Sequence, residues 1–166
     1  MYDAPLGLCF MLKLEPQIPA SGAASNVALA TFLHLLRPTS LQEQRAQRAY
    51  RSEVQQIASR LQGIFEDWLA LREVESDNAV LANAAAVNRW ELMRLARTAE
   101  HLEAPRSWAG VHRDVHNAVL GSARACQLLA NGYRVHKSVV VCDGQALLVE
   151  SVGEINGLVE QLQLRA

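Results

Sequence analysis

The chain has 166 residues, half of them hydrophobic, and its 16 Lys and Arg residues nearly balance its 17 Asp and Glu residues, for a formal net charge of −1. A balance this even provides no general attraction to DNA, RNA or an anionic membrane, so nucleic-acid binding is disfavoured. Aromatic residues make up only 5% of the chain, while alanine and leucine are abundant. This composition favours helices over sheets, and the length suffices to bury a core without disulfides or a metal.

Residues 1–39 are predicted to be irregular apart from one short helix. Three prolines within the first 20 residues interrupt any long element. Residues 23–37 are apolar on almost every side and stop at Pro38, so they predict a short helix that another part of the protein must cover. No apolar run approaches the roughly 20 residues that cross a bilayer, and the three cysteines lack metal-ligand spacing. We therefore expect no membrane span and a cytoplasmic location.

Four long amphipathic helices are predicted after residue 39. The first follows a capping-box spelling, Ser40-Leu41-Gln42-Glu43, in which a hydroxyl caps the helix and a Glu lies three residues further on. In each of the four segments apolar residues recur at steps of three and four, as one buried helical stripe requires. The predicted helices cover residues 41–73, 77–103, 105–131 and 136–164.

The third predicted helix has clear signals at both ends. Pro105 suits a first turn because its ring fixes φ, and Asn131-Gly132 supplies a left-handed stop.

The last segment allows two interpretations. Asp143-Gly144 is a favourable hairpin turn flanked by β-branched residues. An isolated hairpin would have no partner sheet, however, and helical spacing continues through the whole segment. We therefore predict a helix at residues 138–150. Its core-facing stripe is predicted to be Val135, Val139, Cys142, Ala146, Val149, Gly153, Asn156, Val159 and Leu162.

Long helices joined by short loops predict an all-α fold, an up-down-up-down four-helix bundle over residues 40–166 with the short N-terminal helix packed on it. If the chain turns back near Arg134, Cys126 and Cys142 lie at one level and are predicted to face each other. We expect two small buried hydrophobic side chains there, with a disulfide under oxidising conditions as the alternative.

His112 and His116 form the chain's only motif with a candidate chemistry. Side chains four residues apart lie on one helical face, which lets both imidazoles reach one metal ion. Glu154 or Glu53 would complete a modest site for zinc or another divalent ion. The interpretation that we favour is structural: His112 packs beside Trp108 and hydrogen-bonds Asn156, as buried polar groups generally find a partner.

The second predicted helix presents a candidate docking surface. Trp90 falls opposite the core stripe of this helix, near Ala86, Val87 and Met93. An exposed Trp among small apolar residues is typical of a protein-binding patch. The helix at residues 23–37 would cover this face, which is our first choice, or a second copy of the chain would pair there.

The sequence favours a non-enzymatic protein that acts through protein–protein contacts, as a homo-oligomer or an adaptor. No nucleophile elbow, phosphate-binding loop or di-iron pattern occurs in the chain. No cofactor is expected, apart from a divalent ion in the alternative of a metal-binding bundle with His112 and His116. A further alternative is a small-ligand pocket seeded by Trp108, His112 and Asn88.

Overall fold

The structure is a computed structural model that describes residues 41–164. All of these residues belong to one compact unit of the chain. They form helices only, with no strand anywhere between residues 41 and 164, so the prediction of an all-α protein is confirmed. The helix predicted at residues 23–37 and the cap predicted at Ser40 lie outside the described residues.

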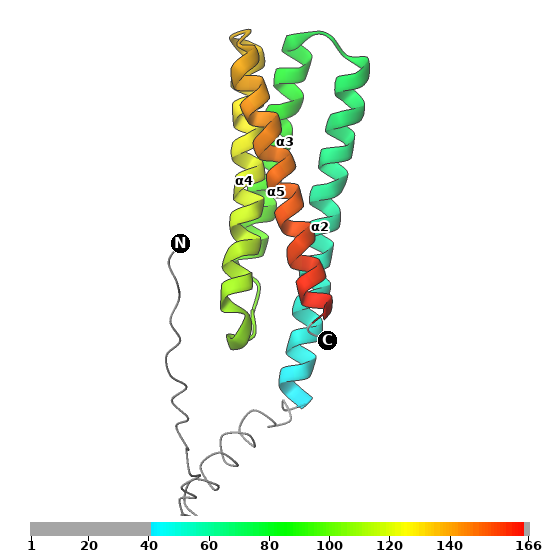
Figure 1. Ribbon diagram of the computed structural model, residues 1–166, viewed down its shortest axis with the longest axis vertical. Helices are drawn as coiled ribbons and strands as arrows, with labels where there is room; N and C mark the ends of the chain where they lie inside the picture. The colour runs from blue at the N-terminus through cyan, green and yellow to red at the C-terminus, as the bar shows by residue number, and fades with distance from the viewer. Residues whose placement is uncertain (1–40, 165–166) are drawn as a thin grey trace, which may run out of the picture. The chain divides into compact units, whose positions relative to one another are not determined.

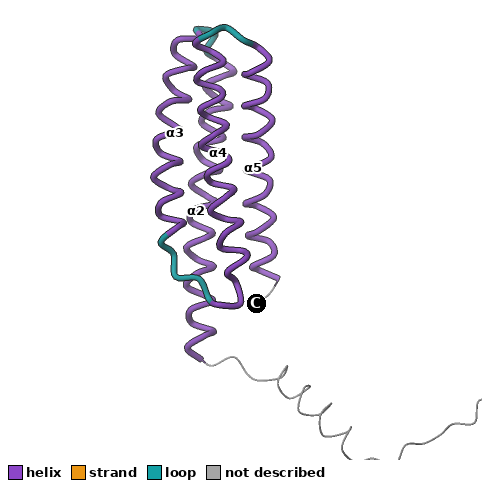
Figure 2. Tube along the Cα trace, turned by 90° about the vertical axis from the view of Figure 1, so that its left-hand side faces the viewer, coloured by secondary structure: helices purple, strands orange, loops and turns teal. Residues whose placement is uncertain are grey.

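Four long helices and one short 3₁₀ turn make up the described part of the chain (Figure 1). They lie side by side, and the α2–α3 and α4–α5 connections are at the same end (Figures 1 and 2). The α4 helix packs along both α3 and α5, whereas α2 makes fewer close backbone approaches to α3 and α5. The elements are α2 (Leu41–Val74), α3 (Asn78–Glu100), η1 (Arg106–Trp108), α4 (Ala109–Arg134) and α5 (Ser138–Leu164).

The α2 helix buries large side chains, whereas α3 and α4 bury many small ones. The fully buried side chains of α2 include Tyr50, Leu61 and Trp68, and the Trp68 ring lies edge-on to Tyr133 of α4 with the centroids 6.0 Å apart. The α3 and α4 helices bury many alanines instead, which lets their backbones approach closely. The buried alanines of these two helices are Ala82, Ala85, Ala96, Ala99, Ala118, Ala123, Ala125 and Ala130.

The α4 helix ends later than predicted. Asn131-Gly132 does not stop the helix, which continues to Arg134, and His136 is the residue in the left-handed region with a φ of 52°. The backbone N–H of Lys137 donates to the carbonyl of Gly132 at 2.9 Å, which satisfies one of the last carbonyls of α4. At its other end, Pro105 precedes the 3₁₀ turn and α4 itself begins only at Ala109.

The α5 helix shows that the helical interpretation of residues 138–150 is correct and the hairpin interpretation wrong. Gly144 is buried in the seam with α4, where an added Cβ would lie 3.0 Å from the backbone nitrogen of Leu129 and 3.1 Å from the carbonyl oxygen of Ala125. The Asp-Gly pair therefore serves close helix packing rather than a turn.

The late turn after α4 changes the predicted register with α5. Cys126 is buried and Cys142 is exposed, and both are free thiols, so the prediction that they face each other is wrong. The chain turns back at residues 135–137 rather than near residue 134, which shifts the partners of α4 along α5 by roughly one helical turn.

The stripe predicted to face the core from α5 in fact lies largely on the outer face. Val139, Cys142, Ala146, Val149 and Gly153 are exposed. The prediction failed because α5 is apolar on nearly every side, so two stripes fit the helical spacing equally well. The residues that α5 buries are Gly144, Leu148, Ser151, Val152, Ile155 and Leu162.

Candidate functional site

Trp90 is the most exposed aromatic side chain in the described part of the chain. It is 69% exposed, whereas Trp68 and Trp108 are 2% and 4% exposed. Val87, one turn earlier on α3, is 64% exposed, and Ala86 and Met93 are half-buried beside it. We call Ala86, Val87, Trp90 and Met93 the Trp90 surface.

The sequence of α3 places the Trp90 surface outward because the opposite side of the helix carries the core stripe. Leu81, Ala85, Leu92 and Ala99 follow one another at intervals of helical spacing and are buried against the neighbouring helices. A helix whose one side is held in this way has no freedom to turn Trp90 inward.

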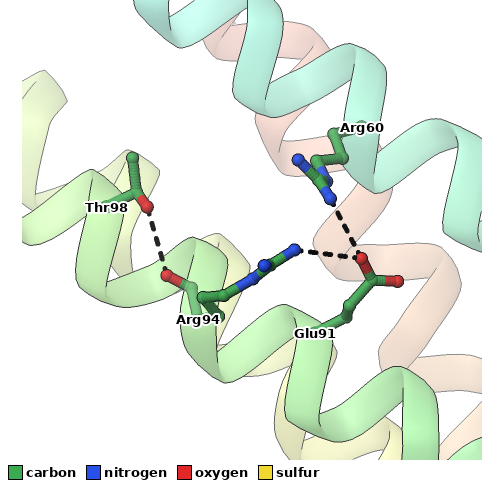
Figure 3. Close-up of polar contacts among 4 residues, drawn as sticks. All are labelled: Arg60, Glu91, Arg94 and Thr98. Carbon is green, nitrogen blue, oxygen red and sulfur yellow. Dashed lines mark hydrogen bonds and ion pairs between the residues drawn. The ribbon is translucent and has the colours of Figure 1, made fainter.

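Two arginines of α3 lie close to Trp90. The Arg89 guanidinium lies over the Trp90 ring, 5.7 Å from its centroid, and Arg94 follows one turn later on the same side of α3. Figure 3 shows that Arg94 shares the Glu91 carboxylate with Arg60 of α2, at nitrogen–oxygen distances of 3.3 Å and 3.0 Å. These exposed ion pairs contribute little stability, but they hold positive charge beside the Trp90 surface.

An open groove lies between α4 and α5. Its volume is about 480 Å³, and Asp114 and Glu154 contribute carboxylates to its lining. Gly153 and Gly157 also line it, and a Cβ added at either glycine would meet nothing within 4 Å. Sequence reasoning missed this groove because it assigned Gly153 to the core. We call it the α4–α5 groove.

His112 finds its partner on α2 rather than on α5. Its Nδ1 lies 3.4 Å from the Tyr50 hydroxyl, and the two rings are tilted with their centroids 6.0 Å apart. Asn156, the partner predicted from the sequence, is exposed. The same Tyr50 ring lies 5.8 Å from Trp108, so Trp108 and His112 share one buried neighbour. Sequence reasoning missed Tyr50 because nothing in the chain specified how α2 aligns with α4.

Two groups in the core keep their protons far into the alkaline range because they are buried. Burial raises the pKa of the Tyr50 hydroxyl to about 12 and the pKa of the Cys126 thiol to about 12. Both groups are protonated at neutral pH, as their ordinary pKa values of 10.0 and 9.0 already require. In this state the Tyr50 hydroxyl can either donate a hydrogen bond to the His112 Nδ1 or accept one from it. The Cys126 thiol behaves as a small apolar side chain.

The three residues of the predicted metal site differ in exposure. His112 and His116 are half-buried on α4, while Glu154 is exposed and lines the α4–α5 groove. Between residues 41 and 164, no group of three or more His, Cys, Asp or Glu side chains lies close enough together to hold a metal ion. Metal binding at His112 and His116 stays a prediction.

The residues predicted to seed a small-ligand pocket are largely occupied by their own chain. Trp108 is buried, with Tyr50 on one side and the Arg51 guanidinium 5.4 Å from its ring centroid. Asn88 is half-buried on α3. The predicted pocket therefore has little room at Trp108.

Across the helices that the structure describes, none combines the length and the apolar character that crossing a membrane requires. Comparisons of the chain with protein-family models, with characterised proteins and with solved structures found no match.

Proposed function

We propose that this protein is non-enzymatic and acts through protein–protein contact, docking through the Trp90 surface as a homo-oligomer or an adaptor in the cytoplasm. The observation that supports this proposal is the exposure of Trp90, at 69%, next to Val87, at 64%. Burying apolar surface contributes about 25 cal/mol per Å², and Trp and Arg are the side chains that most often dominate binding energy at interfaces.

The proposed architecture is an up-down-up-down four-helix bundle that carries a short helix at residues 23–37. That helix would compete for the Trp90 surface, because residues 23–37 are apolar on almost every side and would need a cover. If it occupied the surface, Trp90 would have a purely structural role. A partner protein is the occupant that we propose, because Arg89 and Arg94 beside Trp90 would add charge specificity that an apolar helix cannot use.

Trp90→Glu in the full chain tests the proposal. We expect the variant to lose self-association measured by light scattering, or to lose a partner that the wild-type chain retains in a pull-down. Val74→Glu is the matched control, since Val74 is 85% exposed at the end of α2 and lies outside the Trp90 surface. Assembly and partner retention that both survive Trp90→Glu would contradict the proposal.

Metal binding is the second candidate, supported by the placement of His112 and His116 one turn apart and half-buried on α4. We expect about one divalent ion per chain by elemental mass spectrometry under this alternative, and its loss in His112→Ala. A chain that takes up no zinc when zinc is offered would remove this candidate.

A further inference from the structure

We infer that the Trp90 surface of one chain docks into the α4–α5 groove of a second copy of the same chain. This inference rests on the proposed function and names the partner of the Trp90 surface. It follows from the shape of the groove, from the charges on the two surfaces and from their positions in the fold.

The shape of the groove suits a large side chain. Gly153 and Gly157 leave open space on the α5 side, and the half-buried Leu158 provides an apolar contact beside them. Val149, 58% exposed, lies one turn before Gly153 and extends the apolar surface along α5. An indole inserted here would bury much of the roughly 150–250 Å² that an aromatic side chain can remove from water, with Val87 following it onto Val149.

The charges of the two surfaces are opposite. The α5 helix carries four acidic residues and no Lys or Arg. Asp114 and Glu154 bring two carboxylates to the groove. Arg113 lies beside the Asp114 carboxylate at 3.7 Å, which leaves Glu154 as the groove carboxylate that has no ion pair within residues 41–164. The α3 helix has Arg89 over the Trp90 ring and Arg94 one turn further along. Docking therefore brings the arginines beside Trp90 toward the carboxylates of the α4–α5 groove. A contact of the Trp90 surface with itself would place arginines against arginines, and a contact between two α5 helices would oppose like charges as well.

The two surfaces cannot meet within one chain. The α3 and α5 helices both pack along α4 and make no comparable contact with each other. Both helices run away from the end that holds the α2–α3 and α4–α5 connections (Figure 1). A second copy displaced sideways without rotation therefore lays its α5 parallel to α3 of the first. Trp90 lies near the middle of α3 and Gly153 just past the middle of α5, so the two reach similar heights.

The consequence is a head-to-tail assembly. Each contact uses the Trp90 surface of one chain and the groove of the next, so a pair retains one free Trp90 surface and one free groove. The mass of the assembly is then expected to rise with protein concentration beyond that of a dimer.

Two variants that block opposite sides of the contact test the inference. Trp90→Glu blocks the α3 side, and Gly153→Lys fills the groove with a side chain that repels arginine. The Gly153 variant is expected to fold because its added Cβ meets nothing within 4 Å. Gly63→Lys is the matched control, since Gly63 on α2 has the same open surroundings.

By light scattering, we expect each blocked variant alone to be monomeric and Gly63→Lys to assemble as the wild type does. A mixture of Trp90→Glu with Gly153→Lys is expected to form pairs and stop there, because each chain supplies one intact side. Normal assembly of Gly153→Lys would overturn the inference, and so would a mixture that stays monomeric. If the wild-type chain is monomeric at every concentration, the inference also fails, while Trp90-dependent retention of another protein would still support the proposed function.

A charge exchange tests the same contact without altering its apolar part. We expect Arg89→Glu to weaken the association on the order of tenfold, and Glu154→Arg to weaken it similarly. The double variant Arg89→Glu/Glu154→Arg, in which every contact opposes the two reversed charges, should recover part of this loss. Weakening with no recovery in the double variant would mean that Arg89 and Glu154 do not meet.

Discussion

Tyr50 is the residue through which α2 contacts the first part of α4. Its ring packs near Trp108 and His112, its hydroxyl lies 3.4 Å from the His112 Nδ1, and only 1% of its surface is exposed. A polar group in this position stabilises the fold only while it is neutral, because burial penalises the phenolate. Cys126 of α4 is also only 1% exposed, so burial penalises its thiolate in the same way.

The two groups predict that the protein loses stability in alkali. Burial raises the pKa of Cys126 from 9.0 and that of Tyr50 from 10.0, each to about 12. Between the unfolded and the folded pKa, the unfolded chain has released a proton that the folded chain keeps, so the free energy of unfolding falls as pH rises. The loss from Cys126 should begin near pH 9 and that from Tyr50 near pH 10, and both should continue to about pH 12.

Urea unfolding of wild type, Tyr50→Phe and Cys126→Ala at several values between pH 8 and pH 11 checks this. We expect both variants to show a shallower decline than the wild type, and Cys126→Ala to differ from it already just above pH 9. Because each substitution also removes packing or a hydrogen bond, the slope against pH is the quantity to compare. Three parallel slopes would show that neither group is responsible for the alkaline loss.

The close packing of α4 against α5 depends on small residues. An added Cβ at Gly132 would lie 2.7 Å from the Cγ2 of Val141 and 2.9 Å from its backbone nitrogen. The backbone of α5 cannot withdraw from this position without separating the two helices. Gly132 therefore acts through its lack of a side chain rather than through a special φ, since no glycine in the described residues has a positive φ.

Gly132→Ala is accordingly expected to destabilise the protein by about 1–3 kcal/mol, in spite of the higher helix propensity of alanine. Gly157→Ala is the matched control, because its added Cβ meets nothing within 4 Å. The control should gain up to about 1 kcal/mol from propensity alone. Urea denaturation of both variants measures their free energies of unfolding. A Gly132→Ala variant as stable as the control would mean that α4 and α5 can separate here at little cost.

The same packing shows what the sequence could and could not predict. The spacing of apolar residues predicted all four long helices, because that spacing reflects burial on one side of a helix. It could not select the inner side of α5, where Leu148 and Val149 are both apolar but only Leu148 is buried. The Asn131-Gly132 pair predicted an end of α4 at residue 131, but Gly132 serves packing against α5 and His136 takes the left-handed φ instead.

The candidate site was predictable where it depends on one helix and unpredictable where it depends on two. Trp90 could be placed outward from α3 alone, and it is 69% exposed. The α4–α5 groove and the Tyr50–His112 contact both depend on the alignment of neighbouring helices, which propensity and spacing do not encode. The turn between α4 and α5 sets one of these alignments, and its displacement by a few residues shifted the predicted partners of α4 along α5.

At the scale of the whole molecule, the fluorescence of Trp90 reports what covers its surface. The chain has three Trp residues, and Trp68 and Trp108 are buried, so collisional quenching by acrylamide acts mainly on Trp90. If a second copy covers Trp90, quenching of the full chain should be strong in dilute solution and weaken as the concentration rises. Trp90→Phe should show weak quenching at every concentration, which provides the baseline of the two buried rings.

Quenching of Trp90 would depend on concentration differently if residues 23–37 of the same chain covered it. A helix of the same chain at residues 23–37 would protect Trp90 by an intramolecular contact, whose occupancy does not depend on concentration. Quenching would then be weak in dilute solution and would stay so. Because docking in the α4–α5 groove also requires Gly153 to be open, quenching of Gly153→Lys should remain strong at concentrations that protect the wild type. Equal protection of the two chains at high concentration would place the cover of Trp90 somewhere other than the groove.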